Sequence, residues 1–409
     1  MNRVGIRRED KNRWEARIPL IPDDIARLRA EGLDICVQSS GRRAFGDAEL
    51  TQLGVPVSGE LEGCDVVMGV KEMPLEVFRP GTTYVFFSHV IKGQHYNMPM
   101  LRRLMELGCT LIDYERIVDD EGRRKVAFGF HAGLAGAIDT LWALGQRWAH
   151  LGIETPLSTL EPAHRYGSLH AAKTAISSVG QACRLDPQFD TRAPVIVGVT
   201  GYGRVAQGAH EILDVLEPVE VPPEELGSVE CSRSQFVRVR FEERHFAEPL
   251  DHSGFDLQTY YAHPEAFRGI FGSRYLPHLT ALVNAIYWEP RYPRLVREVD
   301  LRALYAVEKA PRLQVIGDVS CDIEGSIEVT KKATDPSSPV YVWDVDRRAA
   351  LDGFEGRGPA IMAVDILPTE LPREASEAFS TALAPLMPSL ARHDFTRGIE
   401  GLPPELRRA

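Results

Sequence analysis

Three short apolar runs of the chain each end at a titratable residue. Lys71 follows DVVMGV, His89 follows TTYVFFS, and Glu115 closes CTLIDYE. A lysine held among apolar strands beside another cation has a lowered pKa and can act as a base, and a histidine titrates near neutral pH. These residue types therefore predict a site for general acid–base chemistry.

The position of these residues depends on the elements that carry them. Strand-like runs alternate with helix-like stretches through the first third of the chain, which predicts an open α/β sheet with parallel strands. Ligands bind outside the carboxyl ends of such strands, and neighbouring strands lie about 4.8 Å apart. Lys71, His89 and Glu115 are thus expected to share one ligand. The alternative is that each is an ordinary solvated charge, and spacing alone leaves both open.

A glycine-rich turn at residues 200–206, TGYGRVA, supplies a second motif. It fits G-x-G-x-x-(G/A): the first glycine permits the turn, the second lets the backbone approach a pyrophosphate, and the third small residue lets helix and strand pack. A buried-looking strand, VIVGV, precedes the turn and an apolar-periodic helix follows it, which favours dinucleotide binding over a turn without a ligand. The expected cofactor-binding residues are Gly201, Tyr202, Gly203, Arg204 and Val205.

The choice between NADP and NAD depends on the strand that follows this helix. NAD sites usually carry an acidic residue at the end of that strand, about 20 residues beyond the turn. The strand is expected at PVEV, where Glu220 lies inside the strand and Pro222 and Pro223 follow it. Because no acidic residue ends PVEV, the sequence predicts NADP, with NAD as the alternative, although no arginine stands there either.

The pattern along the chain predicts two α/β domains. Residues 128–152 form a glycine- and alanine-rich entry to a long helix, and its GFHAGLAG glycines are expected to permit close helix packing. A second α/β unit starts at APVIVGV, and the pattern changes again after residue 330. Domain boundaries are therefore expected near residues 135 and 330.

Composition excludes several classes of protein. No apolar run of the 409 residues approaches the roughly 20 that a membrane helix needs, and the charged start predicts a cytoplasmic protein without a signal peptide. A net charge of −11 without a basic tract argues against nucleic acid as a partner. The six cysteines form no CxxC pair, which indicates reduced thiols and no metal site. They are Cys36, Cys64, Cys109, Cys183, Cys231 and Cys321.

Taken together, these stretches resemble the saccharopine dehydrogenase and alanine dehydrogenase superfamily. The similarity is greatest to the lysine–2-oxoglutarate reductase half of the bifunctional lysine-degrading enzyme, aminoadipic semialdehyde synthase. GVKEMP and AFGFHAG also resemble the NAD-dependent saccharopine dehydrogenase of fungi. The blocks that carry the resemblance are RREDKNRWEARIPL, GVKEMP, FFSHVIKGQ, LIDYERIVDDEGRRKVAFGFHAG, GYGRVAQGA, LVNAIYWE, GDVSCDIEGSIE and VDILPTELPREAS.

The resemblance implies a fold and a reaction. Two Rossmann-like domains with parallel sheets would flank a cleft: residues 1–135 with 330–409 as the substrate and catalytic domain, and residues 136–329 as the dinucleotide-binding domain. The enzyme would condense the ε-amine of lysine with 2-oxoglutarate and reduce the imine to saccharopine with NADPH. A homo-oligomer is an option, and a separate enzyme would process the saccharopine.

The resemblance also implies roles for single residues. Lys71 and His89 match the catalytic acid–base pair, in which the lysine handles the proton on the amine nitrogen and the histidine handles the carbinolamine oxygen. Arginines that hold substrate carboxylates, residues that tune the pair, and an aspartate that faces the nicotinamide are matched as well. These residues are Arg17 and Arg124, Lys92 and Glu115, and Asp322, respectively.

Other functions compete with this one. The nearest is an NAD-dependent saccharopine dehydrogenase or another opine-type or amino-acid dehydrogenase. Alanine dehydrogenase activity fits less well, because a small substrate would leave several of these cations unused. A nucleotide-sensing regulatory homologue without chemistry is the non-enzyme alternative, and the presence of Lys71, His89 and Arg17 argues against it.

Overall fold

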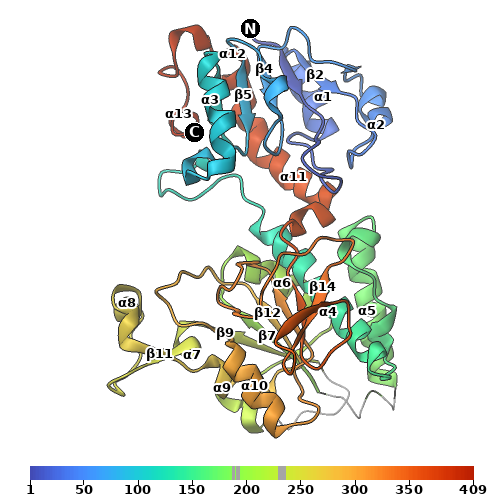
Figure 1. The fold of residues 1–409 in the computed structure, drawn as a ribbon. Helices are drawn as coiled ribbons and strands as arrows, with labels where there is room; N and C mark the ends of the chain where they lie inside the picture. Colours follow the sequence, from blue (N-terminus) through green and yellow to red (C-terminus); the bar gives the residue numbers. More distant parts are fainter. Residues whose placement is uncertain (187–188, 190–193, 229–235) are drawn as a thin grey trace. The chain divides into compact units, whose positions relative to one another are not determined.

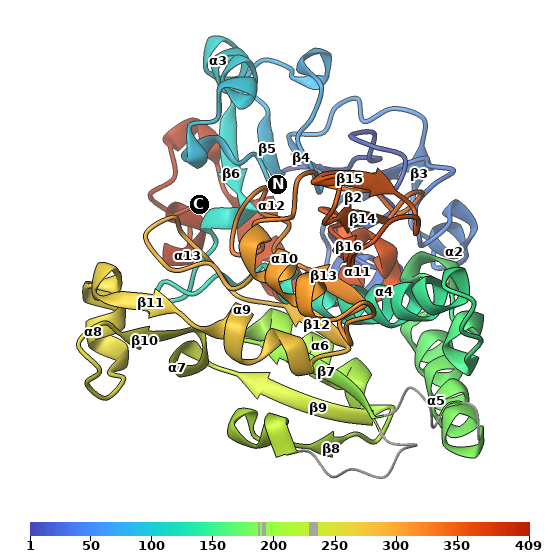
Figure 2. The same cartoon turned by 60° about the horizontal axis from the view of Figure 1, so that its bottom comes forward.

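The computed structural model describes residues 1–186, 189, 194–228 and 236–409, and Cys231 lies outside them. The chain forms two compact units (Figures 1 and 2). Unit 1 contains residues 1–128 and 372–409, and unit 2 contains residues 129–371. Among the described residues, no helix is both long and apolar enough to cross a membrane.

Unit 1 is built on a six-stranded parallel sheet of order β3-β2-β1-β4-β5-β6. This is the doubly wound order, in which ligands bind where the strand order reverses, here between β1 and β4. The strands are β1 Val4–Ile6, β2 Ile35–Gln38, β3 Val57–Ser58, β4 Val66–Met68, β5 Thr83–Phe86 and β6 Thr110–Asp113. The helices are α1 Pro22–Ala30, α2 Asp47–Gln52, α3 Met98–Glu106, α11 Pro372–Leu383, α12 Met387–Arg392 and α13 Pro404–Arg407.

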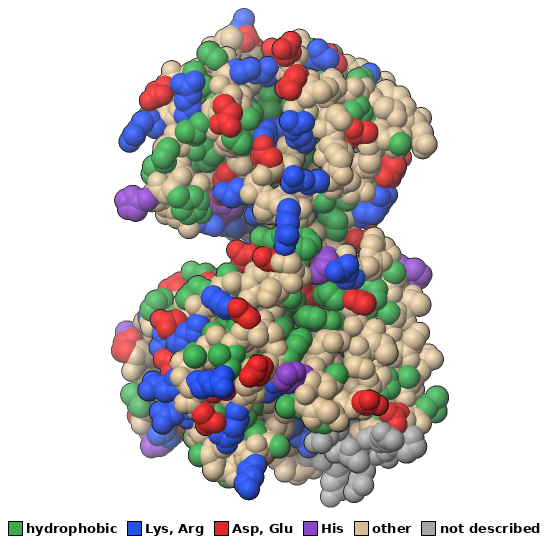
Figure 3. All heavy atoms as spheres, turned by 45° about the vertical axis from the view of Figure 1, so that its right-hand side comes forward, with side chains coloured by type: hydrophobic (Ala, Val, Ile, Leu, Met, Phe, Trp, Pro, Cys, Tyr) green, Lys and Arg blue, Asp and Glu red, His purple; other side chains and the backbone are tan. Residues whose placement is uncertain are grey.

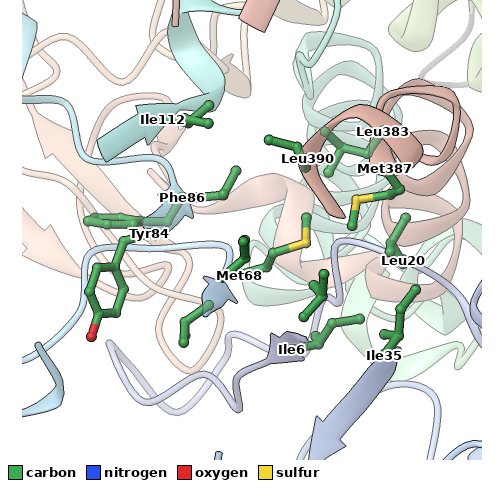
Figure 4. Close-up of a cluster of buried hydrophobic side chains, with 14 of the residues drawn as sticks. Ile6, Leu20, Ile35, Met68, Tyr84, Phe86, Ile112, Leu383, Met387 and Leu390 are labelled. Carbon is green, nitrogen blue, oxygen red and sulfur yellow. The ribbon is translucent and has the colours of Figure 1, made fainter. Parts of the chain in front are cut away.

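The two ends of the chain share the core of unit 1. Figure 4 shows Ile6, Met68 and Phe86 from the central strands beside Leu383 and Met387 from the last helices, and all five are fully buried. The Ser376 and Ser380 hydroxyls of α11 accept hydrogen bonds of 3.0 Å from the Ile18 and Ile21 amides. The segment from Ile18 to Ile21 is thereby held against α11.

Unit 2 contains an eight-stranded mixed sheet of order β15-β14-β16-β13-β12-β7-β9-β8. Its strands are β7 Val195–Thr200, β8 Val219–Glu220, β9 Phe236–Phe241, β12 Ala281–Asn284, β13 Val315–Asp318, β14 Val340–Asp344, β15 Ala349–Asp352 and β16 Ala360–Met362, and a separate hairpin pairs β10 Ala247–Pro249 with β11 Phe267–Gly269. The helices are α4 Gly129–His150, α5 Leu169–Leu185, α6 Arg204–Asp214, α7 Glu243–Phe246, α8 Leu257–Ala262, α9 Phe271–Arg274 and α10 Glu298–Val307.

The structure corrects the second predicted domain boundary. The chain returns to unit 1 at Pro372 and not near residue 330, because β14, β15 and β16 extend the sheet of unit 2. β16 pairs in parallel with β13, whereas β14 and β15 are antiparallel, so this sheet is not wholly parallel as the resemblance implied. An apolar run such as VYVWDV predicts a strand, but it carries no information about which sheet the strand joins.

Helices α4 and α6 pack backbone against backbone through two glycines. A Cβ atom added at Gly133 would overlap the carbonyl oxygen of Val205, and one added at Gly208 would overlap that of Phe130. The expected role of the GFHAGLAG glycines in helix packing is confirmed for Gly129 and Gly133, whereas Gly136 packs against Val319 after β13. This contact fixes the start of α6, which carries the glycine turn.

Charged side chains of both signs are interspersed on the face of the molecule drawn in Figure 3. Among the described residues drawn there, lysine and arginine side chains are mixed with aspartate and glutamate and form no single broad basic patch. Any anionic ligand on this face would therefore be bound by a few local cations, and not by a broad positive field.

Candidate active site

The three predicted strand-end residues follow three adjacent strands. β4 pairs in parallel with β5, and β5 pairs in parallel with β6. Lys71 lies three residues after β4, His89 three residues after β5, and Glu115 two residues after β6. All three residues therefore leave the same edge of the sheet, beside the point where the strand order reverses.

His89 and Glu115 form a hydrogen-bonded pair. The His89 Nδ1 lies 2.8 Å from the Glu115 Oε2. A carboxylate only accepts hydrogen bonds, so Nδ1 carries the proton and Nε2 is left as the basic atom of the neutral ring. The ring is also stacked on Phe87 with 5.8 Å between the centroids. This arrangement orients a histidine for proton transfer at Nε2.

The backbone of His89 adopts a conformation that is rare for residues other than glycine. Its φ is +54°, in the left-handed region. Asp113, the last residue of β6, holds this turn, because its Oδ2 accepts hydrogen bonds from the His89 amide at 3.1 Å and from the Ser88 hydroxyl. A strained, tightly held backbone at a titratable residue is typical of functional sites.

Glu115 is buried and forms ion pairs with two of the predicted cations, Arg124 and Lys92. Arg124 donates to its Oε1 at 2.5 Å, and the Lys92 Nζ lies 3.6 Å from the same oxygen. Burial acts to raise the pKa of Glu115, but the His89 hydrogen bond and the charges of Arg124 and Lys92 outweigh it and lower the pKa below its ordinary value. Both cations are exposed, so each keeps further N–H groups for a ligand.

Lys71 is half-buried, and its amine makes no ion pair with the carboxylates of the described residues. Burial lowers the pKa of Lys71, and the charge of Arg17 lowers it further, whereas Glu15, Glu72 and Glu9 act in the opposite direction. The amine is thereby brought closer to deprotonation at physiological pH than an ordinary lysine. This is the property that a base needs.

Arg17 is buried in unit 1, and a carboxylate that the sequence analysis missed binds it. Its Nε lies 2.7 Å from Glu15 Oε1 and one terminal nitrogen lies 2.6 Å from Glu15 Oε2, a bidentate pair. The guanidinium also lies 4.3 Å from the centre of the Phe128 ring. Glu15 could not be singled out, because RREDKNRWEAR carries too many charges to show which are buried.

In unit 2, the glycine turn joins β7 to α6 as expected. Gly201 has φ of +84°, and its amide donates 2.8 Å to the carbonyl oxygen of Phe241, the last residue of β9. The position of Gly203 faces open space, and Ala206 is fully buried against the sheet. The turn leaves room for a pyrophosphate in front of the first amides of α6, so these residues fit a dinucleotide.

A cavity of about 460 Å³ lies beside the turn and is lined by Gly201, Tyr202, Glu243, Tyr261 and Arg291, among others. Glu243 Oε1 accepts hydrogen bonds from the Tyr261 hydroxyl at 2.7 Å and from the Tyr202 hydroxyl at 3.2 Å. Two tyrosines thus hold this carboxylate in the cavity wall, with its second oxygen available to a ligand.

The premise of the NADP prediction is wrong. PVEV forms β8, the outer strand of the sheet, and the strand beside β7 is β9. β9 is followed directly by Glu242 and Glu243, so acidic residues do stand where a ribose is usually bound. The usual spacing of about 20 residues failed because β8 is interposed along the chain.

A buried polar network lies at the ends of three parallel strands in unit 2. Asn284, which ends β12, donates 2.8 Å to Asp318 Oδ1 at the end of β13 and accepts a 3.0 Å bond from the Thr200 hydroxyl at the end of β7. These residues were not predicted, because they lie in separate stretches of the sequence and no spacing indicates that they contact one another. The network fixes the loop after β13 that carries Asp322, an exposed residue.

The predicted site residues therefore divide between the units. Lys71, His89, Glu115 and the cations around them lie in unit 1, and the glycine turn and Asp322 lie in unit 2. Each group is assembled at the carboxyl edge of its own sheet, where ligands of α/β proteins bind.

Known proteins resemble the chain in sequence. Residues 5–135 match the family model of the alanine dehydrogenase/PNT N-terminal domain. The alpha-aminoadipic semialdehyde synthase of Arabidopsis thaliana is 38% identical over 99% of this chain and 40% of its own length. The mitochondrial enzyme of that name from Bos taurus is 34% identical over 97% of this chain and 44% of its own length. The chain thus spans less than half of these relatives.

Shorter relatives and solved structures match along most of their length. The saccharopine dehydrogenase [NAD(+), L-lysine-forming] of Emericella nidulans is 26% identical over 97% of this chain and 94% of its own. An L-alanine dehydrogenase structure covers 98% of this chain and 91% of its own at 17% identity, with a TM-score of 0.59. The match to a transhydrogenase structure from Sinorhizobium meliloti covers 98% of this chain and 97% of the transhydrogenase chain, at 14% identity and with a TM-score of 0.56. These structures share the α/β fold of two Rossmann-like domains.

Proposed function

From the similarity of the chain to the alanine dehydrogenase and saccharopine dehydrogenase superfamily, we propose that it is a lysine–2-oxoglutarate reductase. It would join L-lysine to 2-oxoglutarate and reduce the imine to saccharopine. The observation that supports this reaction best is the pairing of a half-buried lysine with an oriented histidine on adjacent strand ends. Forming a carbon–nitrogen bond from a ketone needs one group that takes a proton from the nitrogen and one that gives protons to the oxygen.

The residues of unit 1 account for the proton transfers. Lys71 accepts a proton from the substrate amine as its nitrogen attacks the ketone carbon. Protonated His89 gives a proton from Nε2 to the former ketone oxygen, which forms the carbinolamine hydroxyl, and Glu115 stabilises the charged ring. After His89 has been reprotonated by solvent, it gives that hydroxyl a second proton, water leaves, and the nitrogen, which keeps one hydrogen, becomes a protonated imine. When bound, a reduced nicotinamide would supply the hydride that reduces the protonated imine to the amine. Lys71 returns its proton to the product nitrogen.

Substrate carboxylates would be bound by cations that keep free N–H groups. Arg124 and Lys92 are exposed and already share Glu115, so a bound carboxylate would complete an alternating set of charges around His89. Arg17 offers its remaining terminal nitrogen beside Lys71, whose pKa its charge lowers. These contacts would place the ketone carbon next to the acid–base pair.

For the cofactor we propose NADH in preference to NADPH, because Glu243 stands after the strand beside β7. A carboxylate there accepts hydrogen bonds from ribose hydroxyls and repels a 2′-phosphate. The parent is expected to bind NADH at least tenfold more tightly than NADPH, since a hydrogen bond to a charged group contributes about 1.5–3 kcal/mol. Glu243→Gln should weaken the binding of NADH and so reduce the difference between the dissociation constants of NADH and NADPH. Both constants are measured by titration, with the fluorescence of each nucleotide as the signal.

Glu242→Gln is the matched control, because Glu242 is exposed and next in sequence but does not line the cavity. It should leave both dissociation constants near the parental values. Equal or tighter binding of NADPH by the parent would overturn this cofactor assignment and restore the one predicted from PVEV.

A second candidate is the oxidation of saccharopine with NAD+, the same chemistry in reverse. Two observations favour it: the chain covers nearly the full length of the fungal NAD(+)-dependent relatives, and Glu243 lines the cavity. The two candidates use the same residues and differ in physiological direction. The cytoplasmic location, a homo-oligomer and a separate saccharopine-processing enzyme stay predictions.

The reaction is tested by following the absorbance of the reduced nicotinamide. Consumption is expected only when lysine and 2-oxoglutarate are both present, and neither alone should support it. Pyruvate with ammonia is the control for alanine dehydrogenase activity. Nucleotide binding without any turnover would favour the regulatory alternative and contradict the proposal.

A further inference from the structure

Glu9 lies at the point where the strand order of unit 1 reverses. It follows β1, which pairs in parallel with β4, the strand that leads to Lys71. Its Oε1 accepts a hydrogen bond of 2.7 Å from the Val70 amide, and its Oε2 accepts one of 3.0 Å from the Lys71 amide. One carboxylate therefore holds two successive amides of the loop that carries the lysine.

The loop after β4 leaves room for this carboxylate. A Cβ atom added at Gly69 would lie 3.1 Å from Glu9 Oε1 and 2.8 Å from the Met73 Cε. Only glycine lets the carboxylate approach this closely without displacing Met73. The pair of amides and the glycine together form a binding site for the side chain of Glu9.

Glu9 also acts on Lys71 through its charge. Burial and Arg17 lower the pKa of Lys71, and Glu9 is one of three carboxylates that oppose them. Burial in turn raises the pKa of Glu9 to about 7, and the charge of Glu15 contributes, while the two amides and Arg7 oppose this shift. With a pKa of about 7, Glu9 is mostly charged above neutral pH, and its charge then opposes the lowering of the Lys71 pKa.

We propose that Glu9 is a positioning residue for Lys71: its carboxylate binds the Val70 and Lys71 amides and so fixes the loop that carries the lysine, with a negative charge near the amine. This role rests on the proposed function of Lys71 as the acid–base group. The groups that face Glu9 are Arg7 with its partner Asp10, Glu15 with its partner Arg17, Lys71, and the buried hydroxyl of Tyr114.

The test measures the protonation of Lys71 without relying on turnover. Parent and Glu9→Gln are labelled with a small acylating reagent over a range of pH, and the modification of Lys71 is read by peptide mass spectrometry. The midpoint for Lys71 is expected to fall by about one pH unit in Glu9→Gln, the size expected when one nearby charge is lost. Lys173, in unit 2 and paired with Glu211, is the internal control and should not shift.

An unchanged midpoint for Lys71 in folded Glu9→Gln would overturn the inference. If Glu9→Gln does not fold, Glu9→Asp tests the positioning role instead, because its shorter side chain withdraws the carboxylate from the Val70 and Lys71 amides. Hydrogen exchange at Val70 and Lys71 should then become at least tenfold faster, and parental protection would overturn the proposal. If the parent fails to turn over lysine with 2-oxoglutarate, the proposed function falls, while the labelling result still decides the role of Glu9.

Discussion

Replacing Lys71 by methionine is expected to lower kcat by about 10²- to 10⁴-fold, the usual cost of losing a positioned acid–base group. Methionine keeps most of the side-chain volume and removes the titrating amine. The affinity for the dinucleotide should stay near the parental value, because the glycine turn belongs to the other unit. Steady-state kinetics over a range of pH, with nucleotide titrations beside them, measure both effects.

Lys173→Met is a matched control for this substitution. Lys173 lies in α5 of unit 2, is half-buried like Lys71 and is paired with Glu211 at 2.5 Å. Its replacement should leave kcat and the pH–rate profile unchanged. If Lys71→Met retained parental turnover and an unchanged profile, Lys71 would be an ordinary solvated charge and the mechanism would be wrong.

Gly208→Ala is expected to destabilise unit 2 by about 3 kcal/mol, at the upper end of the cost of overpacking. The added Cβ atom would overlap the carbonyl oxygen of Phe130, and because this is backbone, the helices α4 and α6 must move apart. The displacement would begin one helical turn beyond the glycine turn, so dinucleotide affinity should fall with stability. Urea unfolding and nucleotide titration measure the two effects.

Gly254→Ala serves as the control for Gly208→Ala. Nothing lies within 4 Å of the Cβ position at Gly254. The substitution should change stability by no more than about 0.5 kcal/mol, as is common at exposed sites. Equal stability of the two variants would show that α4 and α6 tolerate separation, and that their contact does not fix the glycine turn.

The elements and the strand-end residues could be predicted from local patterns alone. Each of the runs that end at Lys71, His89 and Glu115 is a buried strand, and their order along the chain matches their order in this part of the sheet. Parallel pairing of consecutive strands is the simplest outcome of alternating strands and helices. The position of Lys71, His89 and Glu115 at one edge of the sheet follows from that rule.

Long-range pairing could not be predicted in the same way. β9 lies beside β7 although β8 precedes it in the chain, so the acidic residue absent after PVEV stands after β9, at Glu243. β14, β15 and β16 join the sheet of unit 2. This could not be predicted, because their apolar runs would suit either sheet. The half-buried Glu9 and the buried Glu15 were missed because their partners are backbone amides and a nearby arginine, which leave no spacing signal.

The most direct test of the proposed reaction follows the hydride into the product. The protein is incubated with lysine, 2-oxoglutarate and reduced nicotinamide nucleotide that carries deuterium at the transferred position. The expected product is saccharopine with one deuterium on the former carbonyl carbon of 2-oxoglutarate, now bonded to the lysine nitrogen. Absence of this product, or deuterium found in glutamate that is not joined to lysine, would contradict it.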